Sequence, residues 1–173
     1  MLFDVLVLRK GIRSSVVIDP LRECIYFPEA DAQLGNIHRR EKALYGLFLM
    51  EIPGGGINFR MPTSHQQLER YEVRMKSIMI KYRKIYHMFG GEEANAPDIT
   101  RQEIRLPMIS LIKKQLSELK DILYHVEDYM IQRNFFGNYV VGIPASLCFC
   151  CGVEKTEIKL LSDSDEWRKI SAI

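Results

Sequence analysis

The segment spanning residues 108–161 constrains the fold more than any other part of this chain. Residues 108–126 are amphipathic, and their apolar side chains recur at the spacing of a helix: Ile112, Leu116, Leu119, Leu123 and Val126. A long apolar segment follows at 138–161, and residues 152–155 within it have the composition of a turn. We therefore expect a helix over 108–126, basic in its first half, followed by a C-terminal β-hairpin over 138–161.

The first third of the chain predicts an antiparallel sheet. Short apolar or alternating segments at 2–8, 13–18, 23–27 and 33–37 are typical of strands. The connection Asp19-Pro20-Leu21-Arg22 is a favourable turn, because proline presets φ and aspartate can bind the backbone. Tight connections between short strands favour antiparallel pairing, so we expect an antiparallel sheet over residues 1–38.

Two further helices are predicted between this sheet and residue 108. Residues 43–50 have one apolar helical face, and Pro53-Gly54-Gly55-Gly56 ends that helix. These glycines do not form a phosphate loop, because they follow a helix and lack the Gly-Lys-Ser/Thr ending. A longer helix is expected over 64–89, where apolar residues repeat at heptad spacing: Leu68, Tyr71, Met75, Ile78, Tyr82, Ile85 and Phe89. This pattern fits either the core of the domain itself or a homodimer contact.

Composition is typical of a single globular domain, with 173 residues, 47% of them hydrophobic and 27% charged. The net charge of +2 means that any binding to nucleic acid has to depend on local charge. The apolar N-terminal run precedes its basic residues, unlike a signal peptide, and no run approaches the ~18–20 apolar residues of a membrane span. We expect a cytoplasmic α+β protein with an antiparallel sheet at 1–38, a helical core and hairpin at 39–161, and a tail at 162–173.

The arrangement resembles the winged-helix effector domain of two-component response regulators, without a preceding receiver domain. In that family the first helix ends at an Asn-Pro-Gly turn. The segment that runs here from residues 40–44 to Ile52-Pro53-Gly54 is similar to that helix and its turn. Residues 109–116, Ile-Ser-Leu-Ile-Lys-Lys-Gln-Leu, are similar to its recognition helix, and residues 137–141 are similar to the opening of its wing. The middle helix is longer here, and the wing is apolar where the family's wing is basic.

This resemblance implies a non-enzymatic, transcription-regulator-like protein that binds double-stranded DNA. Basic residues near the first and third helices are the candidates for DNA contact: Arg39, Arg40, Arg101, Arg105, Lys113, Lys114 and Lys120. The same charges are equally typical of a solvated helix face. The alternative function is a winged-helix-derived interaction module that does not bind DNA and instead contacts a protein partner, or a second copy, through the 64–89 helix or the 138–161 hairpin.

The remaining candidate chemistry is structural. Cys148, Cys150 and Cys151 are too closely spaced for a zinc site and are expected to be buried thiols. The four histidines are scattered and match no metal or nucleophile pattern. We therefore expect no catalytic residue, metal or cofactor, and an enzyme would need a clustered acid–base set that the sequence does not present.

Overall fold

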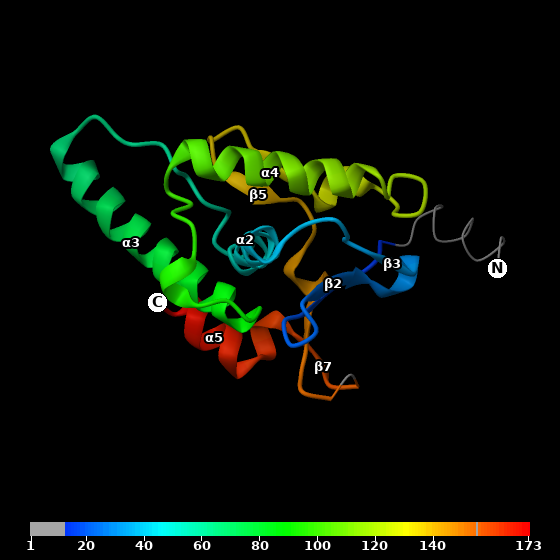
Figure 1. Cartoon of the computed structure of the whole chain (residues 1–173). Coiled ribbons are helices and arrows are strands. Elements are labelled where there is room, and N and C mark those ends of the chain that lie inside the picture. Colours follow the sequence, from blue (N-terminus) through cyan, green and yellow to red (C-terminus); the bar gives the residue numbers. More distant parts are fainter. Residues whose placement is uncertain (1–12, 155) are drawn as a thin grey trace.

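The computed structural model describes residues 13–154 and 156–173 (Figure 1). The strand expected at residues 2–8 lies outside the described residues. The α+β class is confirmed, since a sheet precedes the main helices and a hairpin follows them. In the part of the chain that is described, no helix is long and apolar enough to cross a membrane.

The main sheet combines strands from both ends of the chain. Its order among the described residues is β3 (Ala32–Gln33), β2 (Cys24–Phe27), β1 (Val16–Asp19), β6 (Cys148–Cys151) and β7 (Ile158–Leu160). The β1–β2–β3 part is antiparallel as predicted, and Asp19 Oδ1 accepts from the backbone N–H of Arg22 at 3.3 Å in the expected turn. However, β1 and β6 are parallel, so the complete sheet is mixed.

Helix α2 (Arg39–Met50) lies in the middle of the molecule, between α4 and α5 in the view of Figure 1. Every residue from Ala43 to Met50 is buried, so the helix has no solvated face over its last two turns. Its end follows the prediction. In the turn at 53–56, the N–H groups of the three glycines donate to the carbonyls of Glu51 and Ile52, and Gly55 and Gly56 have φ of 82° and 92°.

Helix α3 (His65–Met88) confirms the predicted long helix, with Ser64 Oγ accepting from Gln67 N at its N-terminal cap. The heptad positions from Met75 onwards are buried in the domain core, although Leu68 and Tyr71 remain partly exposed. A buried ion pair joins α3 to the end of α2, with 2.8 Å between Lys81 Nζ and Glu51 Oε1. The heptad repeat therefore contributes to the core of a single chain.

Helix α4 (Gln102–Ser117) differs from the helix predicted over 108–126 at both ends. It begins six residues earlier and contains Pro107, which removes one backbone donor without ending the helix. It also ends earlier, because residues 118–125 form successive turns up to His125 at φ 52°. The apolar residues Leu123 and Val126 still reach the core from these turns, which explains why the helical pattern appears to continue.

The segment 138–161, predicted to form one hairpin, contributes strands to two separate sheets. Strand β5 (Tyr139–Val141) pairs with β4 (Ile131–Arg133), in a segment where a break was predicted, and only β6 and β7 form the expected hairpin. Gly142, Ile143 and Pro144 separate β5 from β6, and proline cannot donate to a continued ladder. The alternating pattern therefore spans a break between two sheets.

Short helices complete the structure. The 3₁₀ turns are η1 (Pro28–Ala30), η2 (Glu93–Asn95), η3 (Val126–Tyr129), η4 (Ala145–Leu147) and η5 (Leu161–Asp163). The expected tail at 162–173 instead includes helix α5 (Asp165–Ser171). Trp167 and Ile170 on α5 are buried, and a Cβ placed on Gly46 of α2 would lie only 3.3 Å from the Trp167 ring. Packing against α2 is therefore what orders this segment.

Candidate functional site

The predicted DNA-contact residues divide into three groups in the structure. Lys113 and Lys114 are exposed on the last turns of α4, and Lys120 is exposed in the turns that follow. None of these three lysines forms an ion pair with another residue in the described ranges. They are the candidates that remain accessible to a phosphate backbone.

Arg105 corrects the prediction, because its side chain points into the protein. The residue is only 5% exposed, and its Nη1 donates to the carbonyls of Ile99 at 2.8 Å and Thr100 at 3.1 Å. Its guanidinium carbon lies 3.8 Å from the centroid of the Phe59 ring. A buried guanidinium held by carbonyls and an aromatic face stabilises the fold, and a DNA duplex cannot reach it.

The other three arginines are engaged by neighbouring groups. Arg39 Nη2 lies 2.9 Å from Glu23 Oε1, and Arg39 Nε donates to the carbonyl of Phe89 at 2.7 Å. Arg40 pairs with the buried carboxylate of Glu41, and Arg101 pairs with Glu103. These pairs reduce the positive charge that each arginine offers to a partner.

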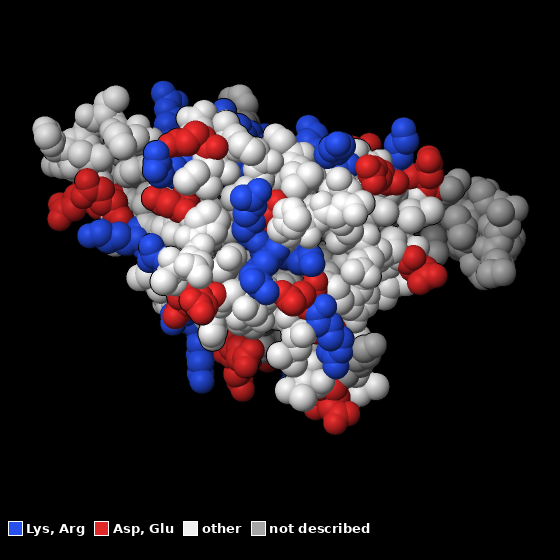
Figure 2. All heavy atoms as spheres, in the orientation of Figure 1, with Lys and Arg blue, Asp and Glu red and all other residues white. Residues whose placement is uncertain are grey.

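The charge on the surface is mixed. Figure 2 shows Lys and Arg gathered over α2 at the centre of this face and again along α4 at the top, with uncharged and acidic side chains between them. Lys113 and Lys114 lie on α4, whereas Arg39 and Arg40 begin α2, and in the view of Figure 2 the basic side chains over these two helices do not form one continuous face.

A second candidate is the tip of the β4–β5 hairpin, where Phe135 and Phe136 form what we call the aromatic tip. Their exposed fractions are 97% and 78%, the two highest among the large exposed hydrophobic residues described. The two rings touch edge to face, with centroids 5.7 Å apart. Two large apolar side chains that are this exposed and adjacent to one another make the tip a candidate interaction site.

The backbone beneath the aromatic tip is well ordered by hydrogen bonds. Asn134 Oδ1 accepts from the backbone N–H of Phe136 and of Asn138, both at 3.0 Å. Gly137 adopts φ 83°, and its N–H donates to the carbonyl of Asn134 at 3.0 Å. These hydrogen bonds constrain the backbone of the turn, and ordering a turn before binding reduces the entropy that binding costs.

The hairpin is also attached firmly to the core. Tyr139 exchanges two backbone hydrogen bonds with Ile57, at 2.8 and 3.0 Å, and its ring packs near those of Phe48 and Phe59. Asn138 Nδ2 donates to the carbonyl of Gly55 at 3.1 Å. These contacts fix the base of the hairpin to the core.

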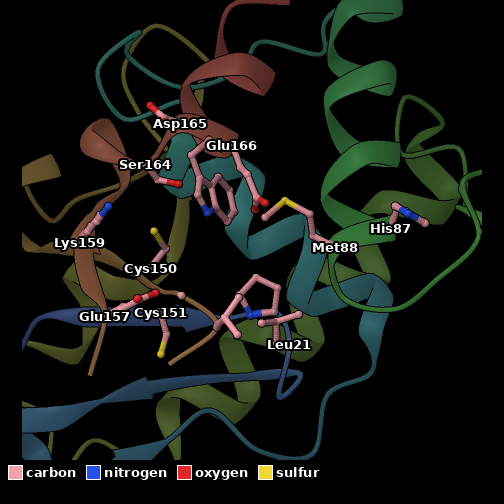
Figure 3. A pocket seen from close by; sticks show the side chains of 14 residues that line it. Leu21, His87, Met88, Cys150, Cys151, Glu157, Lys159, Ser164, Asp165 and Glu166 are labelled. Carbon is pink, nitrogen blue, oxygen red and sulfur yellow. The ribbon is translucent and has the colours of Figure 1, made fainter. Parts of the chain in front are cut away.

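A cavity of about 540 Å³ is the third candidate (Figure 3). It lies between the β1–β2 turn, the end of α3, the β6–β7 hairpin and α5. Cys150 and Cys151 line it, and burial raises the pKa of both thiols, so they are protonated near neutral pH. Protonated thiols are poor nucleophiles, and the cavity does not supply an activated cysteine.

The cysteine-rich strand is buried, as predicted. Cys148, Cys150 and Cys151 all lie within the β6 region of the sheet, and burial raises the pKa of Cys148 to about 12. Across residues 13–154 and 156–173, no cluster of three His, Cys, Asp or Glu side chains has the geometry to hold a metal ion. The strand therefore serves packing, and zinc has no ligand set among these residues.

The aromatic tip is the feature that sequence reasoning missed. Residues 132–138 were expected only as a break between elements, although Asn134 and Gly137 flank the two phenylalanines with typical turn residues. That signal indicates a hairpin turn, but exposure of the rings depends on which strands pair on either side.

No protein-family model, curated protein or solved structure matches this chain.

Proposed function

We propose that this chain is a non-enzymatic, cytoplasmic binding module that contacts a protein partner through the aromatic tip. The observation that carries the proposal is the adjacent, almost fully exposed pair Phe135 and Phe136 on a rigid hairpin. Burying both rings in a partner would contribute roughly 3–6 kcal/mol before the entropic cost of association. Arg133, exposed beside the tip, is a residue type enriched at such interfaces.

The location in the cytoplasm is supported by the cysteines. Cys148 and Cys150 are buried thiols on one strand, and oxidising compartments favour disulfides instead. The proposal gives Cys150 and Cys151 no catalytic role, because burial raises the pKa of both thiols.

The test is comparative affinity purification of the tagged full-length protein from cells that express it at natural levels. Phe135→Ala with Phe136→Ala should reduce recovery of a stoichiometric partner at least about tenfold, because interface aromatics carry much of the binding energy. Met61→Ala with Val73→Ala, which removes two exposed apolar side chains elsewhere, should leave recovery unchanged. Equal recovery by the tip variant and the parent protein would contradict the proposal.

DNA binding is the second candidate, and the exposed lysines Lys113 and Lys114 on α4 favour it. In a winged-helix arrangement, the hairpin that directly follows α4 would take the place of the wing, and here that hairpin is β4–β5. Phosphate contacts release counterions, so affinity for random duplex DNA should fall steeply with salt. Lys113→Glu with Lys114→Glu should abolish this binding while the unfolding midpoint stays within about 1 °C. Affinity that is insensitive to salt would contradict DNA binding.

A further inference from the structure

The cavity shown in Figure 3 has a chemical character that neither proposed function uses. Four segments surround it: the β1–β2 turn, the end of α3, the β6–β7 hairpin and α5. Its volume of about 540 Å³ is in the range of small-molecule sites. Leu21 and Met88 form part of its apolar wall, and Trp167 of α5 contributes an aromatic ring. The cavity can therefore enclose the carbon skeleton of a small molecule.

The indole N–H of Trp167 is a hydrogen-bond donor that the fold leaves unused. The residue is only 2% exposed, so very little of it is available to bulk solvent. Among residues 13–154 and 156–173, no group accepts a hydrogen bond from this N–H. The nitrogen is not fully enclosed either, which means that it opens onto space beside the ring. Buried donors in folded proteins are almost always paired, so the acceptor for this N–H has to come from outside the chain.

Two cavities border the Trp167 ring, and they differ in their polar groups. The smaller one, of about 390 Å³, is lined mainly by apolar residues from the end of α2, the start of β6 and the end of α5. In the cavity of Figure 3, the hydroxyl of Ser164 points toward the interior and provides a second hydrogen-bonding group. An apolar wall with a few convergent polar groups is the usual form of a small-molecule site. This combination makes the cavity of Figure 3 the candidate site.

The charges around this cavity decide which kind of acceptor it can hold. Its lining includes the three carboxylates Glu157, Asp165 and Glu166, of which Asp165 is paired with Arg168, and a single lysine, Lys159. The net negative charge opposes the entry of a carboxylate or a phosphate. A cation without a lone pair cannot accept from an N–H group. An uncharged carbonyl oxygen satisfies the donor and meets neither obstacle.

We propose that this cavity binds a small uncharged compound whose carbonyl oxygen accepts a hydrogen bond from the Trp167 indole N–H, with its carbon skeleton against Leu21 and Met88. Such a ligand pairs the buried donor and also displaces water from the apolar wall, so both contributions favour binding. A hydrocarbon provides only the second contribution, and a charged ligand gains neither without cost.

The test uses 2-piperidone, an uncharged cyclic amide, as the probe and the proton resonance of the indole N–H as the readout. Trp167 is the single tryptophan of the chain, so the full-length protein gives one such signal. Titration should move this signal downfield and saturate at roughly millimolar probe, as expected for so small a ligand. At constant ionic strength, piperidinium chloride, which has the same ring without an acceptor, and the anion cyclopentanecarboxylate should each bind at least about tenfold more weakly. No saturable downfield shift, or equal binding of either control, would overturn the proposal.

Matched variants locate the ligand. Met88→Ala removes part of the apolar wall and should weaken 2-piperidone binding at least about threefold. Met61→Ala, at an exposed methionine outside the cavity, should bind as the parent does, and so should Ala172→Leu, which narrows only the smaller neighbouring cavity. Trp167→Phe keeps an aromatic ring without the donor, and saturation transfer observed on the ligand should show at least about fivefold weaker binding.

Unfolding midpoints establish which variants fold, and Met88→Ala decides the question if Trp167→Phe does not. Equal affinities of Met88→Ala and Met61→Ala, or a loss confined to Ala172→Leu, would refute the assignment to this cavity. Unchanged affinity of a folded Trp167→Phe variant would refute the role of the indole N–H.

Discussion

Arg105 connects three parts of the molecule through one side chain. Its guanidinium lies against the Phe59 ring and donates to the carbonyls of Ile99 and Thr100, just before α4 begins. Burial lowers the pKa of Arg105, yet arginine remains charged at neutral pH because its ordinary pKa is so high. The buried charge is compensated by carbonyl dipoles and the aromatic face, so its function is to fix the start of α4.

Arg105→Ala should therefore destabilise the protein by about 2–4 kcal/mol. The substitution leaves the buried carbonyl of Ile99 without its donor and removes the contact with Phe59. Urea denaturation followed by circular dichroism measures the change. Lys113→Ala, at an exposed position of the same helix, serves as the control and should change stability by less than about 0.5 kcal/mol. Similar losses for both variants would show that Arg105 is not a core residue.

At the scale of the element, helices α2 and α3 follow from local sequence. Helix α3 begins and ends within one residue of the predicted range 64–89, because its repeat and its Ser64 cap are both local signals. The end of α4 was not predictable in this way. Apolar residues continue at helical spacing after Ser117, and only the packing of the following turns on the core decides the backbone.

For the candidate sites too, local sequence predicts what depends on one element but not what depends on contacts between distant segments. Accessibility of Lys113 and Lys114 could be expected from the polar face of an amphipathic helix. The burial of Arg105 could not be expected from the sequence, because Phe59 and Tyr139, which contact it, come from distant parts of the chain. Similarly, pairing of β6 with β1 joins residues that are more than a hundred positions apart, and no local pattern specifies it.

Substitutions at Gly55 and Gly56, in the turn after α2, can test whether the contact of this turn with Tyr139 fixes the β4–β5 hairpin. A Cβ built on Gly56 would lie 2.3 Å from the carbonyl oxygen of Tyr139, whereas a Cβ on Gly55 would meet nothing within 4 Å. Both glycines have positive φ, so alanine adds backbone strain of roughly 1 kcal/mol at either position. The steric clash occurs only at Gly56.

Gly56→Ala should consequently destabilise the protein by at least about 2 kcal/mol more than Gly55→Ala. The additional cost arises because Tyr139 must move, which disrupts its backbone hydrogen bonds with Ile57. Thermal and urea unfolding of the two variants provide the comparison, and hydrogen exchange at Tyr139 N–H should accelerate only in Gly56→Ala. Equal stabilities would mean that the hairpin is not fixed at this contact.

At the scale of the whole molecule, buried phenol groups connect elements from distant parts of the chain. Tyr45 of α2 donates to the carbonyl of Tyr129 at 2.6 Å, and Tyr129 donates to the carbonyl of Ser14 at 2.5 Å. Burial raises the pKa of Tyr129 to about 12, and burial raises the pKa of Cys148 to about 12 as well. The folded protein thus keeps these groups protonated in alkaline solution.

Stability should therefore fall as pH rises from about 9 to about 12. In this window the unfolded chain loses protons from its thiols and phenols near their ordinary pKa values, while the folded state retains them, so alkaline pH favours unfolding. One fully retained proton changes the free energy of unfolding by about 1.4 kcal/mol per pH unit. Urea denaturation between pH 7 and pH 11.5, with a reducing agent present, measures the slope. Cys148→Ala should be less stable than the parent at pH 7, because it loses packed sulfur, but its stability should fall less steeply above pH 9. Parallel pH profiles for the two proteins would show that Cys148 ionises equally in both states.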